Sequence, residues 1–430
     1  FGVFLLTAGL LLVSRAASLW QAGLAFCVLA AVGTAMFGPL PAMAIAANWF
    51  VRKRGLALGV TVAGATAASM LAPPIAAALI DALEQRTGIA RDQVDRLSLG
   101  CVGQIGSQGG HVAMVTKIAA GLPERTVTHT LNNFCVSGLT AIGESAAAIA
   151  AGQADVALAG GVEMMSQVPF MADKADYYGA REFAPRDQYI PVVLAAERLA
   201  TKEGIDRETM DRAAVRSQQL SVGAEDDATL KASRIKIGSL DRDEVVRGLD
   251  MEKAGGLKPA FEKMSEHYAE PLEGEEIDYR MTVAHAPPMA DGAGLALIGS
   301  KEQIANPRAK IVAFAESGGD VRDSLLAGFT AMETALERAG LSLADMDRIE
   351  FMEAFAVTIA KLERDYDVDM EKVNVGGGHM AKGHPMGATG AILLSTLLDA
   401  LDGCEGRYGL VVTTGAQGVG SAMIVERIAR

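Results

Sequence analysis

Residues 132–161, NNFCVSGLTAIGESAAAIAAGQADVALAGG, combine a run of small residues with a short apolar run. The first run opens at Cys135 and predicts a helix of about 17 residues, and residues 155–161 predict a buried strand. Residues 387–401 and 408–415 repeat this order of helix and strand. Helices that alternate with buried strands favour parallel sheets covered by helices. We therefore expect an α/β fold made of two similar halves.

Cys135 lies just before the helical part of this stretch. A thiolate at a helix N-terminus faces unpaired backbone N–H groups and the positive end of the helix dipole, so we expect its pKa to fall from about 8.5 toward neutrality. The alternative is a buried, inert cysteine, since free cysteine is among the most buried residue types. Cys135 is a candidate nucleophile on this local pattern.

A second candidate is His384, in the glycine-rich stretch GGGHMAKGHPMGATG at residues 376–390. Glycines let the backbone approach a partner closely, and Pro385 restricts the turn that aims the imidazole. A histidine in such surroundings is a candidate general base for a thiol on another segment. We expect the sulfur of Cys135 and the imidazole of His384 to lie about 3 to 4 Å apart across one pocket.

Composition limits the other classes of function. The chain has 430 residues, which predicts at least two structural units. Its net charge is −13, and its longest cluster of Lys and Arg is residues 52–54, which argues against nucleic acid as a partner. The 4 cysteines form no CxxC pair, so the sequence indicates neither a metal site nor a disulfide framework.

The N-terminal segment differs from the rest in charge. No Asp or Glu precedes Asp81, and residues 16–50 and 55–80 carry no charge at all. Each run is long enough to cross a hydrocarbon core of roughly 30 Å as a helix, and residues 5–13 are similar to the end of a third span. Two to three membrane-spanning helices are therefore expected, with two buried helices in a large core as the alternative.

A family resemblance supports the membrane interpretation. Residues 48–59, NWFVRKRGLALG, resemble a loop motif of major facilitator superfamily transporters. A complete transporter of that family has many more spans than this segment, so we expect a transporter-like fragment at residues 1–80. Its implied role is to associate the chain with a membrane, and transport itself is the weakest of the functional alternatives.

The remainder, residues 81–430, resembles the thiolase family. Cys135-Val136-Ser137 is similar to its CxS nucleophile motif, and Gly383-His384-Pro385 to its GHP motif. Met352-Glu353-Ala354-Phe355 is similar to its NEAF or HEAF motif. Further similar runs are AGGVEMMS at residues 159–166, KPAF at 258–261 and ADGA at 290–293.

The resemblance implies a duplicated αβαβα layered fold, with one half at residues 81–300 and the other at 301–430. It also implies thiolytic cleavage of a 3-ketoacyl-CoA, or the reverse condensation, through an acyl group on Cys135. His384 would deprotonate the thiol, and the backbone N–H groups of Cys135 and of a glycine near Gly415 would bind an oxyanion. The implied catalytic residues are Cys135, His384, Glu353 and Thr414, and the implied substrate-binding residues are Met165, Phe261, Ala286, Phe355 and Gly415.

The same resemblance implies coenzyme A as co-substrate, no bound cofactor, no metal, a homodimer or tetramer, and a cytoplasmic location for the catalytic part. Three side chains depart from the family. Met352 replaces the Asn or His of the NEAF or HEAF motif, and a thioether cannot hold the water used in the first oxyanion hole. Thr414 stands where most thiolases have a second cysteine, and its hydroxyl is a poor base, so His379 or His285 is an alternative. Pro287 replaces a serine that meets the pantetheine chain.

A further departure is the missing first strand of the thiolase domain. No such strand is recognisable before Asp81, unless LALGVTVAG at residues 56–64 supplies it. We expect a missing central strand to expose two ladder edges. These departures leave one functional alternative open, a catalytically impaired thiolase homologue that binds acyl-CoA without cleaving carbon–carbon bonds.

Overall fold

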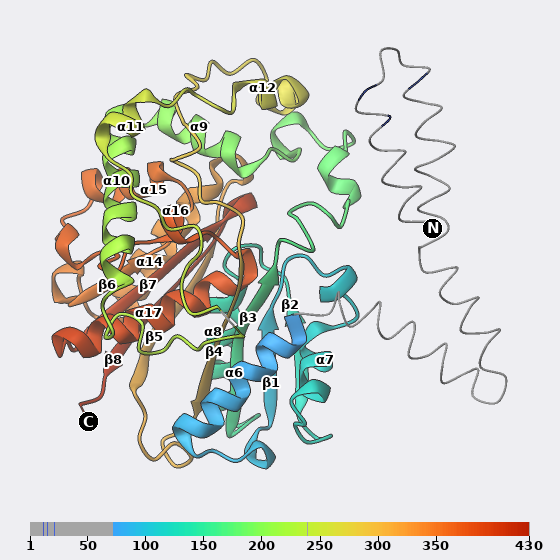
Figure 1. Ribbon diagram of the computed structural model, residues 1–430, viewed down its shortest axis with the longest axis vertical. Helices are drawn as coiled ribbons and strands as arrows, with labels where there is room; N and C mark the ends of the chain where they lie inside the picture. Colours follow the sequence, from blue (N-terminus) through green and yellow to red (C-terminus); the bar gives the residue numbers. More distant parts are fainter. Residues whose placement is uncertain (1–11, 13–14, 16–20, 22–71, 239, 430) are drawn as a thin grey trace. The chain divides into compact units, whose positions relative to one another are not determined.

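A computed structural model describes residues 12, 15, 21, 72–238 and 240–429 (Figure 1). The chain divides into two compact units, Phe1–Leu71 and Ala72–Arg430, and both sheets of the described part lie in the second unit. The spans expected within residues 5–71 lie outside the described residues, apart from the single positions 12, 15 and 21. None of the helices in the described part has the length and apolar character that crossing a membrane requires.

Two four-stranded sheets form the framework of this second unit. In the first sheet the strand order is β2-β1-β3-β4, and in the second it is β5-β8-β7-β6. The strands of the first sheet are β1 Arg96–Gly100, β2 Val127–Leu131, β3 Val156–Met164 and β4 Asp291–Gly299. Those of the second are β5 Ala309–Gly318, β6 Arg348–Phe351, β7 Tyr408–Gly415 and β8 Val419–Arg427.

Both sheets are mixed, whereas the sequence predicted parallel ones. β1 pairs in parallel with β2 and β3, and β6 pairs in parallel with β7. β4 runs antiparallel to β3, and β8 runs antiparallel to β7 and β5. The turn from β7 to β8 is the short η11, Ala416–Gly418, and so short a connection permits only an antiparallel pair.

Three consecutive strands of each sheet correspond, which confirms the predicted duplication. β1, β3 and β4 match β6, β7 and β8 in order and direction. β5 lies beyond β8 at an edge of its sheet, and the described residues hold no counterpart of it beyond β4. The expectation of a central gap is therefore wrong: β1 pairs directly with β3, and the missing strand would lie at the edge of the sheet beside β4.

The helices complete five layers. α8 Ser137–Ala150 and α17 Thr389–Cys404 lie between the sheets and contact strands of both (Figure 1). α6 Ala72–Thr87 and α7 Val112–Ala119 cover the outer face of the first sheet, and α14 Ala327–Ala339 covers the second. Residues 72–80, the described part of the uncharged run, therefore form the first turns of a helix that packs on this fold.

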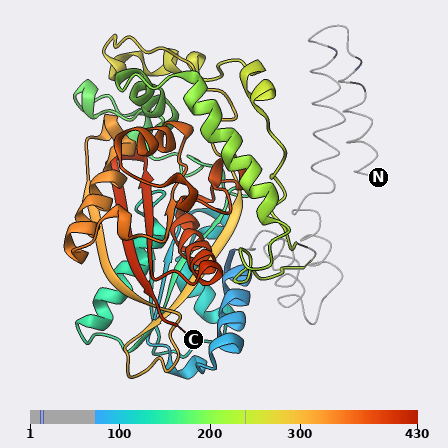
Figure 2. The same ribbon diagram turned by 90° about the vertical axis from the view of Figure 1, so that its left-hand side faces the viewer.

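Residues 165–290, between β3 and β4, form a loop region that lies mostly above the sheets in Figure 1, while the chain after residue 224 runs down past α17 to α6, where Arg86 donates a hydrogen bond to the carbonyl oxygen of Ser233. It holds α9 Val192–Lys202, α10 Arg207–Ala224, α11 Met251–Gly256, α12 Glu262–Ser265 and α13 Ala269–Leu272. Figure 2 shows α10 as the long green helix that descends from this region, where it packs against α15 Ala356–Asp365 and α16 His379–Lys382. The loop region thus covers the end of the second half that carries the glycine-rich stretch.

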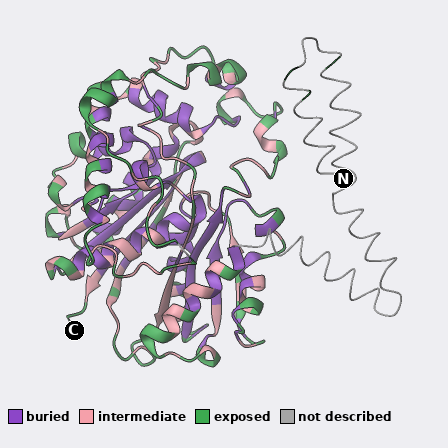
Figure 3. Cartoon of the chain, viewed as in Figure 1, coloured by how far each residue is buried: buried purple, intermediate pink, exposed green. Residues whose placement is uncertain are grey.

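The largest apolar core joins the middle layer to the second sheet. It includes Leu139 of α8, Phe351 of β6 and Leu397 of α17, all fully buried. A smaller core lies under α6 and α7. Figure 3 shows the strands and the middle helices buried, with exposed residues concentrated on the loop region and the outer turns. The fold therefore depends on close contact between the two halves.

One backbone contact between the halves gives a testable prediction. A Cβ atom at Gly161 of β3 would overlap the carbonyl oxygen of Gly387. Both residues are held by backbone contacts here, so neither chain segment can move aside cheaply. Gly161→Ala is expected to lower the free energy of unfolding by about 1–3 kcal/mol. Gly223→Ala, in an open position on α10, is the matched control and should be neutral or stabilise by about 0.5 kcal/mol. Equal denaturant midpoints for both variants would contradict this.

Candidate active site

The loop between β2 and α8 holds Cys135 in a tight bend. Phe134 adopts a left-handed backbone conformation with φ 45°, and Asn132 Oδ1 accepts its backbone N–H. Ser137 Oγ donates to the carbonyl oxygen of Phe134 at 2.6 Å and accepts the backbone N–H of Asn133. The serine of the CxS motif therefore holds the bend, and the cysteine precedes the N-cap residue Val136 of α8.

The thiol of Cys135 faces the turn between β7 and β8. The backbone N–H groups of Ala416 and of Cys135 itself favour the charged form of the sulfur, and a Cβ atom at Gly415 would lie 3.3 Å from the Cys135 backbone nitrogen. Gly415 therefore packs closely against Cys135, and a side chain in its place would also meet Val419. The sequence predicted a glycine N–H near Gly415 at this place, whereas the N–H of this turn that favours the thiolate is that of the neighbouring Ala416.

Burial raises the pKa of Cys135 to about 12, and the negative charge of Glu163 adds to the effect. The prediction of a lowered pKa is therefore wrong. The N–H donors favour the thiolate, but they are outweighed by the loss of solvation around the sulfur. The resting residue is a neutral thiol, which needs a base to become a nucleophile.

His384 lies in a loop with one ring nitrogen bound and one free. Its Nδ1 is 2.8 Å from Thr389 Oγ1, and its backbone N–H donates to the carbonyl oxygen of Pro288. Its Nε2 is buried without a hydrogen-bond partner among the described residues. Burial lowers the pKa of His384 to about 4, so the imidazole is neutral at neutral pH and can accept a proton.

Glu163 of β3 ties the segment after β1 and the loop of His384 to the first sheet. Its buried carboxylate accepts the backbone N–H groups of Val102, Gly103 and Gly387, and the side-chain amide of Gln108. The carbonyl oxygen of Gly387 in turn lies 2.7 Å from where a Cβ of Gly138 would stand. The loop of His384 therefore packs on the helix that follows Cys135, and the predicted 3 to 4 Å separation of the two side chains stays a prediction.

The side chain of Glu353 does not face an open pocket but binds neighbouring backbone and side-chain groups. Its carboxylate accepts hydrogen bonds from Ser217 Oγ, Asn374 Nδ2 and the backbone N–H of Met380. It is 1% exposed, and burial raises its pKa. These bonds fix the glycine-rich stretch that leads to His384, so the structure gives Glu353 a positioning part.

Thr414 is turned away from the thiol. Successive residues of a strand point to opposite faces, and Gly415 is the residue that meets Cys135. The buried hydroxyl of Thr414 donates to the carbonyl oxygen of Leu325 at 2.9 Å, and its Cβ faces Gly328 of α14. The structure therefore does not bring Thr414 to the place expected for the second cysteine of the family.

His285 is also committed elsewhere. Its Nδ1 accepts the backbone N–H of Thr282, so its proton is on Nε2, which donates to Asp211 Oδ1 at 2.7 Å. Its carbonyl oxygen accepts the N–H of Ala356. With both ring nitrogens bound and the side chain fully buried, His285 connects α10 to the loop after residue 280 and is no free base.

The predicted binding residues fall into three places. Met165 belongs to a small apolar cluster with Val102 and Met386, against which Phe134 packs next to the nucleophile. Gly415 adjoins Cys135 directly. Phe261, Ala286 and Phe355 belong to, or pack against, the large core that Cys135 also touches. A cavity of about 10 Å³ beside Val102, Phe170 and Met386 has room for about one water.

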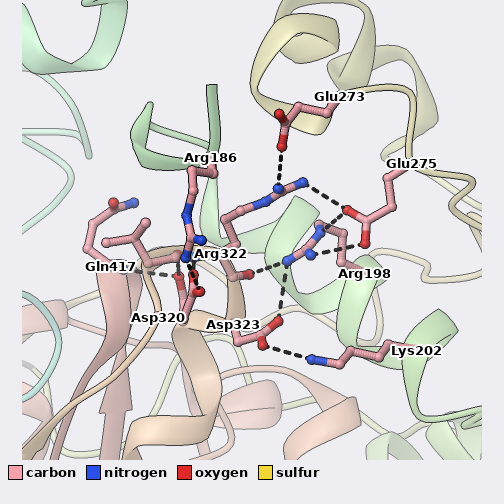
Figure 4. A network of polar contacts seen from close by, with 11 residues as sticks. Arg186, Arg198, Lys202, Glu273, Glu275, Asp320, Arg322, Asp323 and Gln417 are labelled. Atoms are coloured by element: carbon pink, nitrogen blue, oxygen red, sulfur yellow. Dashed lines mark hydrogen bonds and ion pairs between the residues drawn. The ribbon is translucent and has the colours of Figure 1, made fainter. Parts of the chain in front are cut away.

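A network of charged side chains supports the turn at residues 415–418 from the loop region (Figure 4). Arg198 of α9 pairs with Glu275 and with Asp323 of η7 Val321–Leu326, and Lys202 pairs with Asp323 at 2.8 Å. The same η7 supplies Ser324 Oγ to the backbone N–H of Gln417 and the carbonyl of Leu325 to Thr414. The further pairs in the network are Arg186–Asp320, Arg322–Glu273 and Arg322–Glu275.

Among the described residues, no group of three or more His, Cys, Asp or Glu side chains is arranged to bind a metal ion. Among the site residues that were not predicted from the sequence, only Glu163 could have been found there, because it lies in the thiolase-like run AGGVEMMS at residues 159–166.

Comparisons with known proteins agree with this geometry. The family model of the thiolase N-terminal domain matches residues 58–302, and that of the C-terminal domain matches residues 305–427. The first match begins inside residues 1–80, and the transporter resemblance of that segment finds no support. An acetyl-CoA acetyltransferase of Syntrophomonas wolfei is 34% identical over 373 residues, which cover 80% of this chain and 90% of that protein.

A steroid 3-ketoacyl-CoA thiolase of Mycobacterium tuberculosis is 33% identical over 365 residues, covering 80% of this chain and 86% of that protein. Among solved structures, human mitochondrial 3-ketoacyl-CoA thiolase matches with a TM-score of 0.72 at 29% identity, over 82% of this chain and 92% of that one. The acetyl-CoA acetyltransferase of Bacillus anthracis matches with a TM-score of 0.71 at 28% identity, over 84% and 92%. Two matching domain models and relatives aligned over most of their length show that the chain belongs to the thiolase family.

Proposed function

We propose that the protein is a thiolase-type acyltransferase that cleaves a 3-ketoacyl-CoA to an acyl-CoA and acetyl-CoA, or runs the reverse condensation. The observation that carries this proposal is a neutral thiol at Cys135 and a neutral imidazole at His384, whose Nε2 has no partner among the described residues, on segments that pack together through Gly138 and Gly387. Relatives named as acetyltransferases and 3-ketoacyl-CoA thiolases support the reaction class. Coenzyme A is the co-substrate, and no bound cofactor takes part.

The first half-reaction starts with proton transfer from Cys135 Sγ to His384 Nε2. The hydroxyl of Thr389 can accept a hydrogen bond from Nδ1–H, which keeps the imidazole oriented as it becomes charged. The thiolate attacks the keto carbon C3, and the resulting alkoxide is stabilised by backbone N–H groups at Cys135 and the 415–416 turn. The alkoxide collapses, the C2–C3 bond breaks, and its electron pair leaves on the enolate of acetyl-CoA.

The proton taken from the thiol is the one that C2 of the enolate requires, so the first half-reaction closes with acetyl-CoA released and the acyl group on sulfur. In the second half-reaction the thiol of coenzyme A gives its proton to the imidazole and its sulfur attacks the acyl group. Cys135 leaves as a thiolate and recovers the proton. Two acyl transfers thus replace one direct carbon–carbon cleavage.

The alternative is a homologue that binds and accepts acyl groups without cleaving carbon–carbon bonds. Met352, fully buried where the family motif has Asn or His, and the committed hydroxyl of Thr414 favour it. Intact-mass spectrometry after mixing the protein with acetoacetyl-CoA, with and without coenzyme A, separates the two. Thiolase function predicts an acetyl adduct on Cys135 that coenzyme A removes with formation of acetyl-CoA. An adduct from acetyl-CoA without cleavage of acetoacetyl-CoA would support the alternative.

We also propose that the protein forms a homodimer or tetramer. β2 is the edge strand of the first sheet, and Val127 on it is 51% exposed. Ile118 on the neighbouring α7 is 69% exposed. An open edge with apolar side chains is a place where a second chain adds strands. Light scattering of the purified protein measures the oligomeric state, and a monomer at micromolar concentration would refute this proposal.

A further inference from the structure

A second histidine, His379, lies against His384 and has no role in the mechanism described so far. The ring centroids of His379 and His384 are 5.5 Å apart at an interplanar angle of 78°, an edge-to-face arrangement. His379 is 5% exposed, and its Nδ1 is buried without a hydrogen-bond partner among the described residues. The Nε2 of His384 is in the same condition. Two neighbouring imidazoles therefore each keep a buried nitrogen free.

The backbone around His379 is held firmly. Glu353 accepts the N–H of Met380, and Ser217 Oγ accepts the N–H of Gly378. A Cβ at Gly378 would collide with the Glu353 carboxylate, so the chain passes as close to that group as glycine permits. Leaving a buried polar nitrogen unpaired is unfavourable, and such groups call for a functional explanation.

Met352 leaves the site without the hydrogen-bonding side chain that the family motif has at this position. Its side chain is fully buried in the large core, and a thioether is a weak acceptor with no proton to donate. In the proposed reaction, negative charge develops on the thioester oxygen of the departing acetyl-CoA enolate. His384 alone offers a ring N–H there after it has taken the thiol proton. A second donor on the neighbouring ring would compensate for the missing Asn or His of the motif.

We propose that His379 is a further catalytic residue, which donates a ring N–H to the enolate oxygen of acetyl-CoA beside His384. The inference rests on the thiolase function proposed above. The hydrogen bond transfers no proton: the C2–C3 electron pair moves onto the enolate, and the proton from Cys135 still ends on C2. Burial lowers the pKa of His379 well below its usual value, so the ring is neutral and retains one N–H across the neutral range. A neutral imidazole is a suitable donor to a developing oxyanion.

Two assays on the full chain separate the enolate step from acyl transfer. Cleavage of acetoacetyl-CoA, and hydrogen–deuterium exchange at the methyl group of acetyl-CoA, both require the enolate. Exchange of labelled coenzyme A into acetyl-CoA requires acylation of Cys135 but no enolate. His379→Ala is expected to lower the first two rates about 100-fold, a typical loss for one oxyanion donor, and to leave thiol exchange within a few-fold.

His379→Asn keeps a side-chain N–H and should retain activity within about tenfold of wild type, and M352N/H379A should regain at least about tenfold over His379→Ala. His267→Ala, at an exposed histidine, is the matched control and should leave all rates unchanged. Unchanged cleavage and deuterium exchange in His379→Ala, or an equal fall of all three rates, would overturn the inference. Absence of thiol exchange in the wild type would instead refute the acyl-enzyme function itself.

Discussion

Replacing Cys135 by alanine is expected to lower the rate of acetoacetyl-CoA thiolysis by about 10⁴-fold or more. In the proposed mechanism the sulfur beside the 415–416 turn carries the acyl chain. Removal of the nucleophile from comparable covalent enzymes lowers the rate by about 10⁴-fold or more. Backbone N–H groups that bind the oxyanion remain, but without the sulfur they have no intermediate to stabilise. The steady-state rate with saturating coenzyme A measures the loss.

Cys404 provides the matched control for Cys135. It lies at the end of α17, is partly exposed and places its thiol 3.6 Å from the carbonyl oxygen of Leu401. Cys404→Ala should keep the wild-type rate within about twofold, since a solvent-facing substitution away from a site has little effect. Equal thiolysis by wild type and Cys135→Ala would remove Cys135 from the mechanism.

Replacing His384 by asparagine is expected to lower kcat/KM about 10³-fold. Asparagine can keep a hydrogen bond to Thr389 but cannot take the proton of a thiol whose pKa is about 12. Loss of the base contributes about 10²-fold or more, and the replacement of the imidazole N–H by an amide N–H at the enolate contributes up to about a further tenfold. Retention of wild-type kcat/KM by this variant would assign the base elsewhere.

The pH profile of the wild type depends on the same imidazole. Because burial lowers the pKa of His384 to about 4, the free base persists well below pH 6.5, and kcat/KM should fall only as the pH approaches 4. The unfolded imidazole binds a proton below about pH 6.5 while the folded one does not, so this residue lowers the stability of the native state as the pH falls from 6.5 toward 4. Thermal unfolding in parallel with kinetics distinguishes the two effects. An acid limb centred near 6.5 with the protein still folded would contradict the prediction.

The nucleophile and the base were recognisable from local patterns. Cys135 before a small-residue helix and His384 among glycines each carry their signal within about fifteen residues, and the helix–strand order on both sides revealed the duplication. The observed strand β7, Tyr408–Gly415, agrees with the predicted range. The position of the missing strand was misjudged, because the pairing of β1 with β3 joins segments about sixty residues apart and no local pattern specifies it.

Thr414 and Gly415 show the limit of a motif alignment. Both stand in one short run, yet the alternation of a strand sends one toward Leu325 and the other toward Cys135. A shift of one position in the alignment therefore exchanges a residue behind the sheet for one in the site. Glu353 shows a similar limit, since its motif marks it as important and its contacts make it a support for the glycine-rich stretch.

The amino-acid sequence by itself determined the family, the two halves, and which sulfur and imidazole are available for chemistry, because these depend on residue type and short-range order. The tertiary structure alone decided that the thiol rests protonated, that His285 is engaged by Asp211, and that His379 lies against His384. These properties depend on solvation and on neighbours brought from distant segments, and the free energy of a charge or a lone pair is set by the atoms around it rather than by its place in the chain.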